Sequence, residues 1–363
     1  MSLKLEVFSR DRDLEGQRRL FVNAFPEQIG TSLEGQGHYF WKFASFPNLP
    51  NSYEYGAWDN NLMVGYYAAI PYSYSIEGVS ACAGMVCDVM THSEARGKGV
   101  FTRLGHFALQ RMRENGIDFT IGYPIRPAVL PGHLKVGWRV AFKLPMYLKI
   151  IRTYSILNLY RVGWLSPLID LIFYIYNALV VGGLVNWRIR SSPYEMRSLA
   201  VKDFLELSNY SEFFQAWSKT VKNYLIKNQN FYRWRLGAPS SEYQCHTVFR
   251  QGALVGVAIT RKIDLRKVPS LAILDLMVLP EHQPAYGLLF EYLKGIATGS
   301  GAEVIVTMMS AKTASRCALI WNGFIRSPLV FKLIINSLSN KLDRDKLLDE
   351  KNWHLMWIDS DDI

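Results

Sequence analysis

The sequence predicts a mixed α/β fold in which two tandem copies of one unit follow each other, and three observations predict it. The chain has 363 residues, a natural length for two domains rather than one. Its composition of 49% hydrophobic, 20% charged and 13% aromatic residues excludes intrinsic disorder, collagen and low-complexity arrays. The order of motifs in the first half also recurs in the second half, at a spacing of about 190 residues.

The first copy alternates apolar strands with turn residues and one helical run. The predicted strands are bounded by glycine, proline and asparagine, which end regular structure, and a hairpin turns at 59–61 through Asp-Asn-Asn. In chain order the sequence predicts an aromatic cluster, the hairpin, a buried strand, a glycine loop leading into a helix, and two further strands: 38–41, 53–70, 83–90, 96–113, 117–123 and 139–150.

The second copy repeats that order. Its predicted elements are an aromatic cluster, a hairpin, a buried strand, a helix and two strands: 231–234, 243–260, 271–278, 287–298, 303–309 and a last strand after Gly323. Matched landmarks follow the same sequence in both copies: Trp41 and Trp234, Gly65 and Gly256, Met90 and Met277, Gly116 and Gly301, Gly137 and Gly323. Such an ordered series indicates duplication. We therefore expect domains at 1–150 and 193–363, joined by a linker at 151–192.

The linker is unusually apolar. The stretch 165–185 holds a single charge, Asp170, which makes it a candidate membrane span. Pro167 and the glycine pair at 182–183 limit its uninterrupted run to 168–181, which is short of the ~20 residues that a span needs. We expect a helix packed between the two domains. An interfacial helix resting on a membrane, with Arg152, Arg161, Arg188 and Arg190 beside it, and a true span stay open as alternatives.

Charge and cysteine content limit which partners and which cellular compartment we expect. The formal net charge of +10 favours anionic partners without choosing among them. The four cysteines contain no C-x-x-C pair and the histidines are scattered, so we expect neither a metal site nor a disulfide framework. The acidic residues at 359–362 read as a solvated tail. The N-terminus has no signal-peptide pattern, and we expect a cytoplasmic protein.

The residues around the first glycine loop carry the chemistry. A buried strand enters a loop with two glycines, and a helix begins directly after it, so backbone N–H groups and the positive end of the helix dipole converge on one point. This arrangement suits a phosphate or pyrophosphate, although an ordinary strand-to-helix turn with a basic edge has the same pattern. The candidate ligand-binding residues are Val89, Met90, Thr91, Arg96, Gly97, Lys98, Gly99, Val100 and Phe101.

Arg96 and Gly99 between a strand and a helix, with Gly137-Trp138 further along, resemble the Gcn5-related N-acetyltransferase (GNAT) superfamily, and the duplicated order is most similar to bacterial tandem acetyltransferases. The resemblance implies that the loop grips the pyrophosphate of acetyl-coenzyme A and that the first copy is catalytic. Phe101 departs from the motif, in which Gly or Ala is usual. The corresponding loop of the second copy, 284–287, reads Pro-Ala-Tyr-Gly and has lost both basic residues, so we expect no coenzyme there.

An amine that attacks a thioester must lose a proton, and the departing thiolate gains one. The resemblance places the acid four residues before Gly137, where this chain has His133; Tyr123 at a strand end is a second candidate. Asp88 or Glu94 is the candidate base. Two of these candidates also have a structural explanation. His133 could cap a helix, and the Asp88 carboxylate could accept hydrogen bonds from the backbone or from a tyrosine.

The aromatic residues of region 25–50 could form an acceptor wall or belong to the core: Phe25, His38, Tyr39, Phe40 and Trp41. The leading hypothesis is a cytoplasmic N-acetyltransferase that moves an acetyl group from acetyl-CoA to a small amine or amino sugar, without metal or nucleic acid. The alternatives are an aminoacyl-tRNA-dependent acyltransferase and a non-catalytic CoA-binding scaffold. Peripheral membrane contact through 150–192, as for a lipid-linked sugar acceptor, and the oligomeric state stay open.

Overall fold

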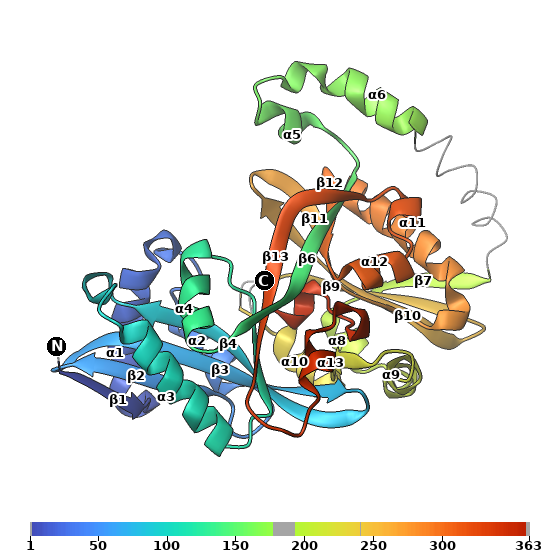
Figure 1. Cartoon of the computed structure of the whole chain (residues 1–363). Helices are drawn as coiled ribbons and strands as arrows, with labels where there is room; N and C mark the ends of the chain where they lie inside the picture. Colours follow the sequence, from blue (N-terminus) through green and yellow to red (C-terminus); the bar gives the residue numbers. More distant parts are fainter. Residues whose placement is uncertain (1, 177–192, 240, 361–363) are drawn as a thin grey trace.

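The computed structural model describes residues 2–176, 193–239 and 241–360, which form one mixed sheet covered by helices (Figure 1). The first half comprises β1 (Leu3–Val7), α1 (Arg10–Ala24), η1 (Pro26–Gln28), α2 (Gln36–Ala44), β2 (Tyr53–Asp59), β3 (Leu62–Ile76), β4 (Val79–Thr91), η2 (Ser93–Ala95), α3 (Val100–Glu114), β5 (Phe119–Gly122), η3 (Pro127–Val129), α4 (Leu130–Lys135) and β6 (Arg139–Ile150).

The linker contains short helices, and the second half again alternates strands with helices. They comprise α5 (Tyr154–Asn158), η4 (Gly163–Leu165), α6 (Ser166–Tyr176), β7 (Tyr194–Leu199), α8 (Val201–Leu205), α9 (Tyr210–Ser218), β8 (Asn223–Leu225), α10 (Gln229–Arg235), β9 (Tyr243–Arg250), β10 (Ala253–Leu265), β11 (Val268–Val278), η6 (Pro280–His282), α11 (Pro284–Gly299), β12 (Val304–Met308), α12 (Ala311–Arg316), η7 (Ile320–Asn322), β13 (Ile325–Ser337), α13 (Arg344–Leu348), η8 (Glu350–Asn352) and η9 (Trp357–Asp359).

The order and direction of the strands are the same in the two halves of the chain. Strands β1 to β5 lie in chain order, with only β4 and β5 parallel, and β7, β9, β10, β11 and β12 are arranged in the same way. Helices cover both faces of the sheet, so β3 and β11 are buried along almost their whole length. A strand covered on both faces reads as a continuous apolar run, which is why these two segments were recognisable in the sequence.

The last strand of each copy joins the other copy's sheet. The end of β6 pairs with β12 through Met146–Ile150, and the end of β13 pairs with β5 through Ile334–Ser337. Strands β6 and β13 also pair with each other, so the sheet runs without interruption from one copy to the other. Both strands lie where the sequence predicts them. Their partners did not follow from the sequence, because strand periodicity shows which residues are buried but not which neighbour pairs with the strand.

Within the described residues, the linker helices do not pack between the two halves (Figure 1), so that expectation is wrong for this part of the linker. Helices α5 and α6 project from the body (Figure 1), and most of the large apolar side chains of α6 are exposed. None of the helices within the described ranges is long and apolar enough to cross a membrane. Gly182, Gly183, Arg188 and Arg190 lie outside the described residues.

The acidic C-terminus is not simply a solvated tail. Asp359 is fully buried, and its carboxylate lies 2.9 Å from the Lys227 ammonium, which also contacts Asp275 at 2.8 Å. Burial raises the pKa of Asp359 to about 6. The charge pattern suggested exposure, but a buried lysine that needs compensating charge holds Asp359 inside. Asp361 and Asp362 lie outside the described residues.

Candidate active site

The glycine loop follows β4 and ends at the start of α3. Gly97 and Gly99 have φ values of 75° and 78°, in the left-handed region that glycine adopts without strain. Gly99 is the N-cap of α3, and no side chain caps this fifteen-residue helix. The first N–H groups of the helix are therefore available to an anion, as the sequence predicts.

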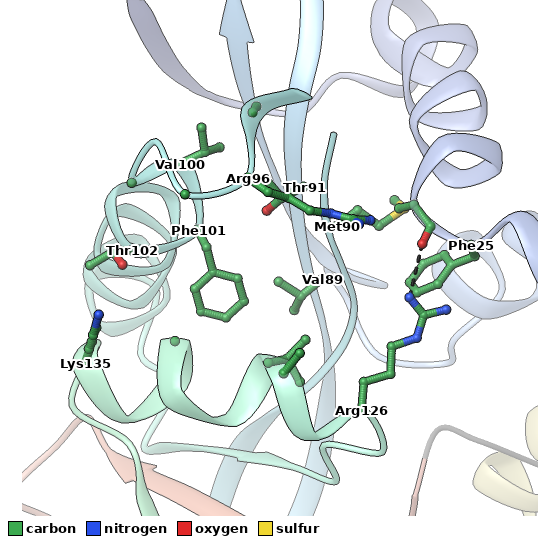
Figure 2. A pocket seen from close by; sticks show the side chains of 17 residues that line it. Phe25, Val89, Met90, Thr91, Arg96, Val100, Phe101, Thr102, Arg126 and Lys135 are labelled. Atoms are coloured by element: carbon green, nitrogen blue, oxygen red, sulfur yellow. Dashed lines mark hydrogen bonds between the residues drawn. The ribbon is translucent and has the colours of Figure 1, made fainter. Parts of the chain in front are cut away.

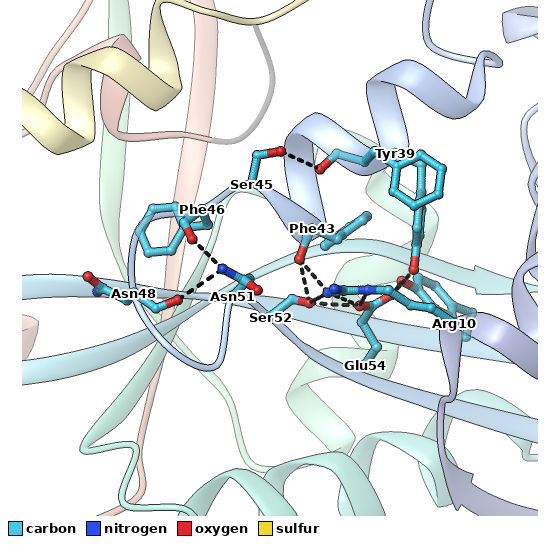
Figure 3. A network of polar contacts seen from close by, with 11 residues as sticks. Arg10, Tyr39, Phe43, Ser45, Phe46, Asn48, Asn51, Ser52 and Glu54 are labelled. Atoms are coloured by element: carbon cyan, nitrogen blue, oxygen red, sulfur yellow. Dashed lines mark hydrogen bonds and ion pairs between the residues drawn. The ribbon is translucent and has the colours of Figure 1, made fainter.

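A cavity of about 450 Å³ lies beside this loop (Figure 2). Eight of the nine predicted ligand-binding residues line it: Val89, Met90, Thr91, Arg96, Gly97, Gly99, Val100 and Phe101. Lys98 is exposed and does not line it. Lys135 of α4 adds a cation that the sequence analysis did not single out. The predicted anion loop is thus part of an actual cavity.

Phe101, the departure from the family motif, packs between α3 and α4. Its ring lies 5.0 Å from the His133 ring at an angle of 87°. A Cβ on Gly132 would come within 2.7 Å of the Phe101 ring, so this close contact requires glycine at position 132. Phe101 therefore lines the cavity on the side of α4 (Figure 2).

Arg126 and Phe25 form the opposite wall (Figure 2). The Arg126 guanidinium lies 4.5 Å from the centre of the Phe25 ring, donates to the Ala24 carbonyl at 3.1 Å, and pairs with Glu27. Arg126 could not be predicted from the sequence, because its partners Ala24 and Glu27 lie about 100 residues away in the chain.

A second cavity, of about 600 Å³, adjoins the first. Phe25, Val89, Arg126 and Val129 line both cavities, so the two lie next to each other. Three candidate catalytic residues line the second cavity: Asp88 from β4, Tyr123 directly after β5 and His133 from α4. Pro239, Ser241 and Arg261 of the second half complete its wall. The fold thus brings the predicted residues together beside the anion loop.

Asp88 lies on a β-bulge. Its φ is 47°, and the pairing of β3 with β4 shifts by one residue at this point. A bulge changes the direction of a side chain and interrupts the strand pairing. The Lys42 ammonium donates to Asp88 Oδ1 at 2.8 Å, so the carboxylate is held by an ion pair. Lys42 was missed in the sequence. Its only signal is that it follows Trp41, as Arg235 follows Trp234 in the second copy.

His133 is buried among aromatic rings, with Phe101 and Trp138 each about 5 Å away. Burial lowers its pKa to about 4, so its imidazole is neutral at pH 7. Tyr123 is also buried and faces the second cavity. Glu94, the other candidate base, is exposed on η2 and lines neither cavity.

The aromatic residues of region 25–50 divide between wall and core. Phe25 and His38 line the second cavity. Tyr39 and Trp41 are buried in the core, whereas Phe40 is largely exposed. Tyr39 and Trp41 therefore belong to the core, and Phe25 and His38 remain candidates for an acceptor wall.

The second copy differs at the matching loop. Helix α11 begins at Pro284, and Ala285 and Tyr286 are buried. The positions that correspond to the basic loop residues are thus filled by proline and core side chains. Asp275, which corresponds to Asp88, is fully buried with Lys227. Among the described residues, no group of three or more His, Cys, Asp or Glu side chains could hold a metal ion.

The acetyltransferase (GNAT) domain family matches residues 9–141, the segment that carries the loop and the three candidate catalytic residues. The match assigns residues 9–141 to a GNAT domain. No curated protein matches the sequence of this chain.

Solved structures extend the GNAT likeness to nearly the whole chain. A probable N-acyltransferase from Enterococcus faecalis is 12% identical over 93% of this chain and 73% of its own, with a TM-score of 0.65. A GCN5-related N-acetyltransferase from Anabaena variabilis is 14% identical over the same shares, with a TM-score of 0.64. Saccharomyces cerevisiae N-myristoyltransferase with bound myristoyl-CoA is 12% identical over 98% and 84%, with a TM-score of 0.60. At these identities the likeness concerns the fold.

Proposed function

We propose that this GNAT protein transfers an acetyl group from acetyl-CoA to the amine of a small molecule, in residues 1–150, with residues 193–363 completing the acceptor cavity. The observation that carries the proposal is that two cavities share a wall, one beside the uncapped start of α3 and the other lined by Asp88 and Tyr123. One can hold a donor and the other an acceptor beside it.

The loop fits the pyrophosphate of a CoA ester. A Cβ built on Gly97 or Gly99 meets nothing within 4 Å, so open space lies directly over the backbone. The uncapped N–H groups of α3 and the Arg96 and Lys135 side chains face the same cavity with hydrogen-bond donors and positive charge. The bound ester would supply an activated thioester carbonyl.

Asp88 and Tyr123 have the chemistry that transfer requires. The amine nitrogen forms a bond to the carbonyl carbon while the carbon–sulfur bond breaks. Asp88 accepts the proton that the amine loses, directly or through water, and Tyr123 donates a proton to the departing thiolate. Lys42 holds Asp88 in position through the 2.8 Å ion pair. His133, neutral at pH 7 because burial lowers its pKa to about 4, is the weaker candidate acid.

The walls of the second cavity favour a small polar acceptor. A volume of about 600 Å³ with walls from both halves suits a small molecule such as an amino sugar. Lys42 and Arg126 each pair with a carboxylate, whereas Arg261 Nη1 is buried and has no hydrogen-bond partner among the described residues. A guanidinium donates to the oxygens of sugars, carboxylates and phosphates, so Arg261 supports an oxygen-rich acceptor.

Calorimetric titration of acetyl-CoA into the wild type and Gly99→Glu tests the donor site. We expect one site per chain with micromolar affinity, abolished in Gly99→Glu because the new carboxylate occupies the anion position. Gly78→Glu is the matched control: Gly78 has a φ of 83°, lies on an exposed turn, and lines neither cavity. It should bind like the wild type.

The other outcomes identify the alternatives. Binding without transfer to any amine in a screen of amino sugars and small amines would support a CoA-binding scaffold. No binding to the wild type would contradict the proposal and favour an aminoacyl-tRNA-dependent enzyme, which RNA filter binding at moderate salt would detect. The likeness to a structure that contains myristoyl-CoA makes longer acyl-CoA esters the second donors to titrate.

A further inference from the structure

The described part of the linker forms an exposed apolar arm, defined here as residues 154–175. It consists of α5, η4 and most of α6, and it projects from the body of the protein (Figure 1). Trp164, Tyr160 and Tyr174 are 77%, 74% and 72% exposed. The exposed large apolar residues of the arm are Tyr154, Leu159, Tyr160, Trp164, Leu168, Leu171, Ile172, Tyr174 and Ile175.

So dense an apolar surface is costly to leave in water. Scattered apolar residues are normal on soluble proteins, but a contiguous apolar patch marks an interaction site. Within the arm, only Arg161 and Asp170 carry charge. Asp170 Oδ1 accepts hydrogen bonds from the Thr153 N–H at 2.8 Å and hydroxyl at 2.7 Å, so this carboxylate is engaged at the base of the arm. The exposed side chains of α6 are otherwise apolar or aromatic.

We infer that the arm lies in the interfacial region of an anionic membrane. The exposed large apolar side chains of α6 within the described residues, Leu168, Leu171, Ile172, Tyr174 and Ile175, would enter the interface with the helix lying along the surface. Tryptophan and tyrosine are the residues that favour the membrane–water interface. The arm exposes one tryptophan and three tyrosines.

Charge complementarity favours an anionic membrane, rather than a second copy of the chain, as the partner that binds the arm. Arg152 and Arg161 are exposed beside the apolar side chains, and the whole chain carries a net charge of +10. Anionic headgroups attract such a surface, whereas pairing two copies through their arms would bring like charges together.

The base of the arm is fixed to the second half. Ser155 donates to the Glu303 carboxylate through its N–H at 2.8 Å and its hydroxyl at 2.9 Å, and the N–H groups of Ile151 and Arg152 donate to the Glu303 carbonyl. These bonds lie directly before β12 and set the direction of the arm. A membrane that binds the arm would therefore hold the sheet in a defined orientation.

Vesicle flotation tests the inference. Purified full-length protein is floated with vesicles of phosphatidylcholine alone and with vesicles that also contain phosphatidylglycerol. We expect co-flotation with the anionic vesicles, weaker binding to the neutral ones, and a blue shift of tryptophan fluorescence on binding. The double variant Trp164→Ser, Leu171→Ser should bind at least about tenfold more weakly, because it removes the large apolar groups that enter the interface.

The double variant Ile320→Ser, Trp321→Ser is the matched control. Both residues are strongly exposed, with Trp321 at 84%, but they lie on η7 outside the arm. The control should float like the wild type, and circular dichroism should show that both double variants are folded. Failure of the wild type to bind anionic vesicles would overturn the inference. A wild-type dimer in light scattering that Trp164→Ser, Leu171→Ser dissociates, without vesicle binding, would instead identify the arm as a dimer contact.

Discussion

Trp41 and Trp234 stack with their ring centres 5.1 Å apart and their planes 8° from parallel, and each indole N–H donates to the backbone carbonyl of the other, at 2.7 and 2.8 Å. The two residues occupy the matching position of the two copies. A reciprocal contact of this kind is what a two-fold axis produces in a symmetric dimer, so the duplicated chain preserves a local two-fold relation within one molecule.

The tryptophan pair should contribute strongly to stability. Trp234→Ala should lower the free energy of unfolding by about 3–5 kcal/mol, since it removes a large buried side chain. Trp41→Phe keeps most of the packing and should cost about 1 kcal/mol, because the Trp234 carbonyl loses its donor. Urea denaturation followed by circular dichroism measures both. Trp321→Ala, at an exposed position, should change the value by less than about 0.5 kcal/mol; an equal loss there would contradict the role of the pair.

Asp88 should matter for turnover rather than for donor binding. Asp88→Asn keeps the size of the side chain but cannot accept the amine proton, and kcat should fall about 100-fold or more. The affinity for acetyl-CoA should stay within about twofold, because Asp88 lines the second cavity and not the first. Steady-state kinetics and calorimetry separate the two effects. Unchanged kcat would exclude Asp88 as the base.

Tyr123 and His133 should differ as candidate acids. Tyr123→Phe should lower kcat about 100-fold, since it removes the proton donor. His133→Gln should leave the dependence of kcat on pH between 6 and 8 unchanged, because burial lowers the pKa of His133 to about 4 and the ring does not titrate in this range. Loss of an acidic limb from the profile in His133→Gln would reverse the assignment.

Buried histidines should make the fold sensitive to acid. Burial lowers the pKa values of His38, His133 and His246 to about 4, against about 6.5 in the unfolded chain. The unfolded state then binds more protons as the pH falls from about 6.5 to 4, so stability should fall over that window. Burial also lowers the pKa values of His354 and His282, which act in the same direction. Asp359, whose pKa is raised to about 6, is a single group that acts in the opposite direction.

Thermal unfolding at pH 7.5, 6 and 5 measures this dependence. The Tm should fall steadily, and His133→Gln, which lacks one of the titrating groups, should show a smaller fall. A Tm that is constant or rises between pH 7.5 and 5 would show that the histidines are not buried as described.

Arg261 should act on the acceptor alone. Arg261→Gln removes the positive charge that the second half contributes to the acceptor cavity, and the KM for the acceptor should rise about tenfold while the affinity for acetyl-CoA is unchanged. Lys262→Gln, a change at the neighbouring position of β10, which lines neither cavity, is the control and should have no effect. Equal effects of the two changes would exclude a specific role for Arg261.

The sequence by itself determined the elements and the anion loop. Strands, turns and helices depend mainly on residues that are neighbours in the sequence. The apolar strand pattern, the glycines at 97 and 99 and the helical run after them therefore predicted β4, the loop and α3 near their observed places. Trp41 and Trp234 could be matched for the same reason, because the order of motifs around them is the same in both copies.

Only the tertiary structure decided which distant groups meet. Four features join or separate segments far apart in the chain: the Lys42–Asp88 ion pair, the contribution of Arg261 to the second cavity, the exchange of β6 and β13, and the exposure of the arm. Strand pairing and side-chain contact over such separations depend on the packing of the whole sheet, on which local periodicity carries no information. An apolar run such as 168–181 is therefore equally consistent with burial and with exposure until its neighbours are known.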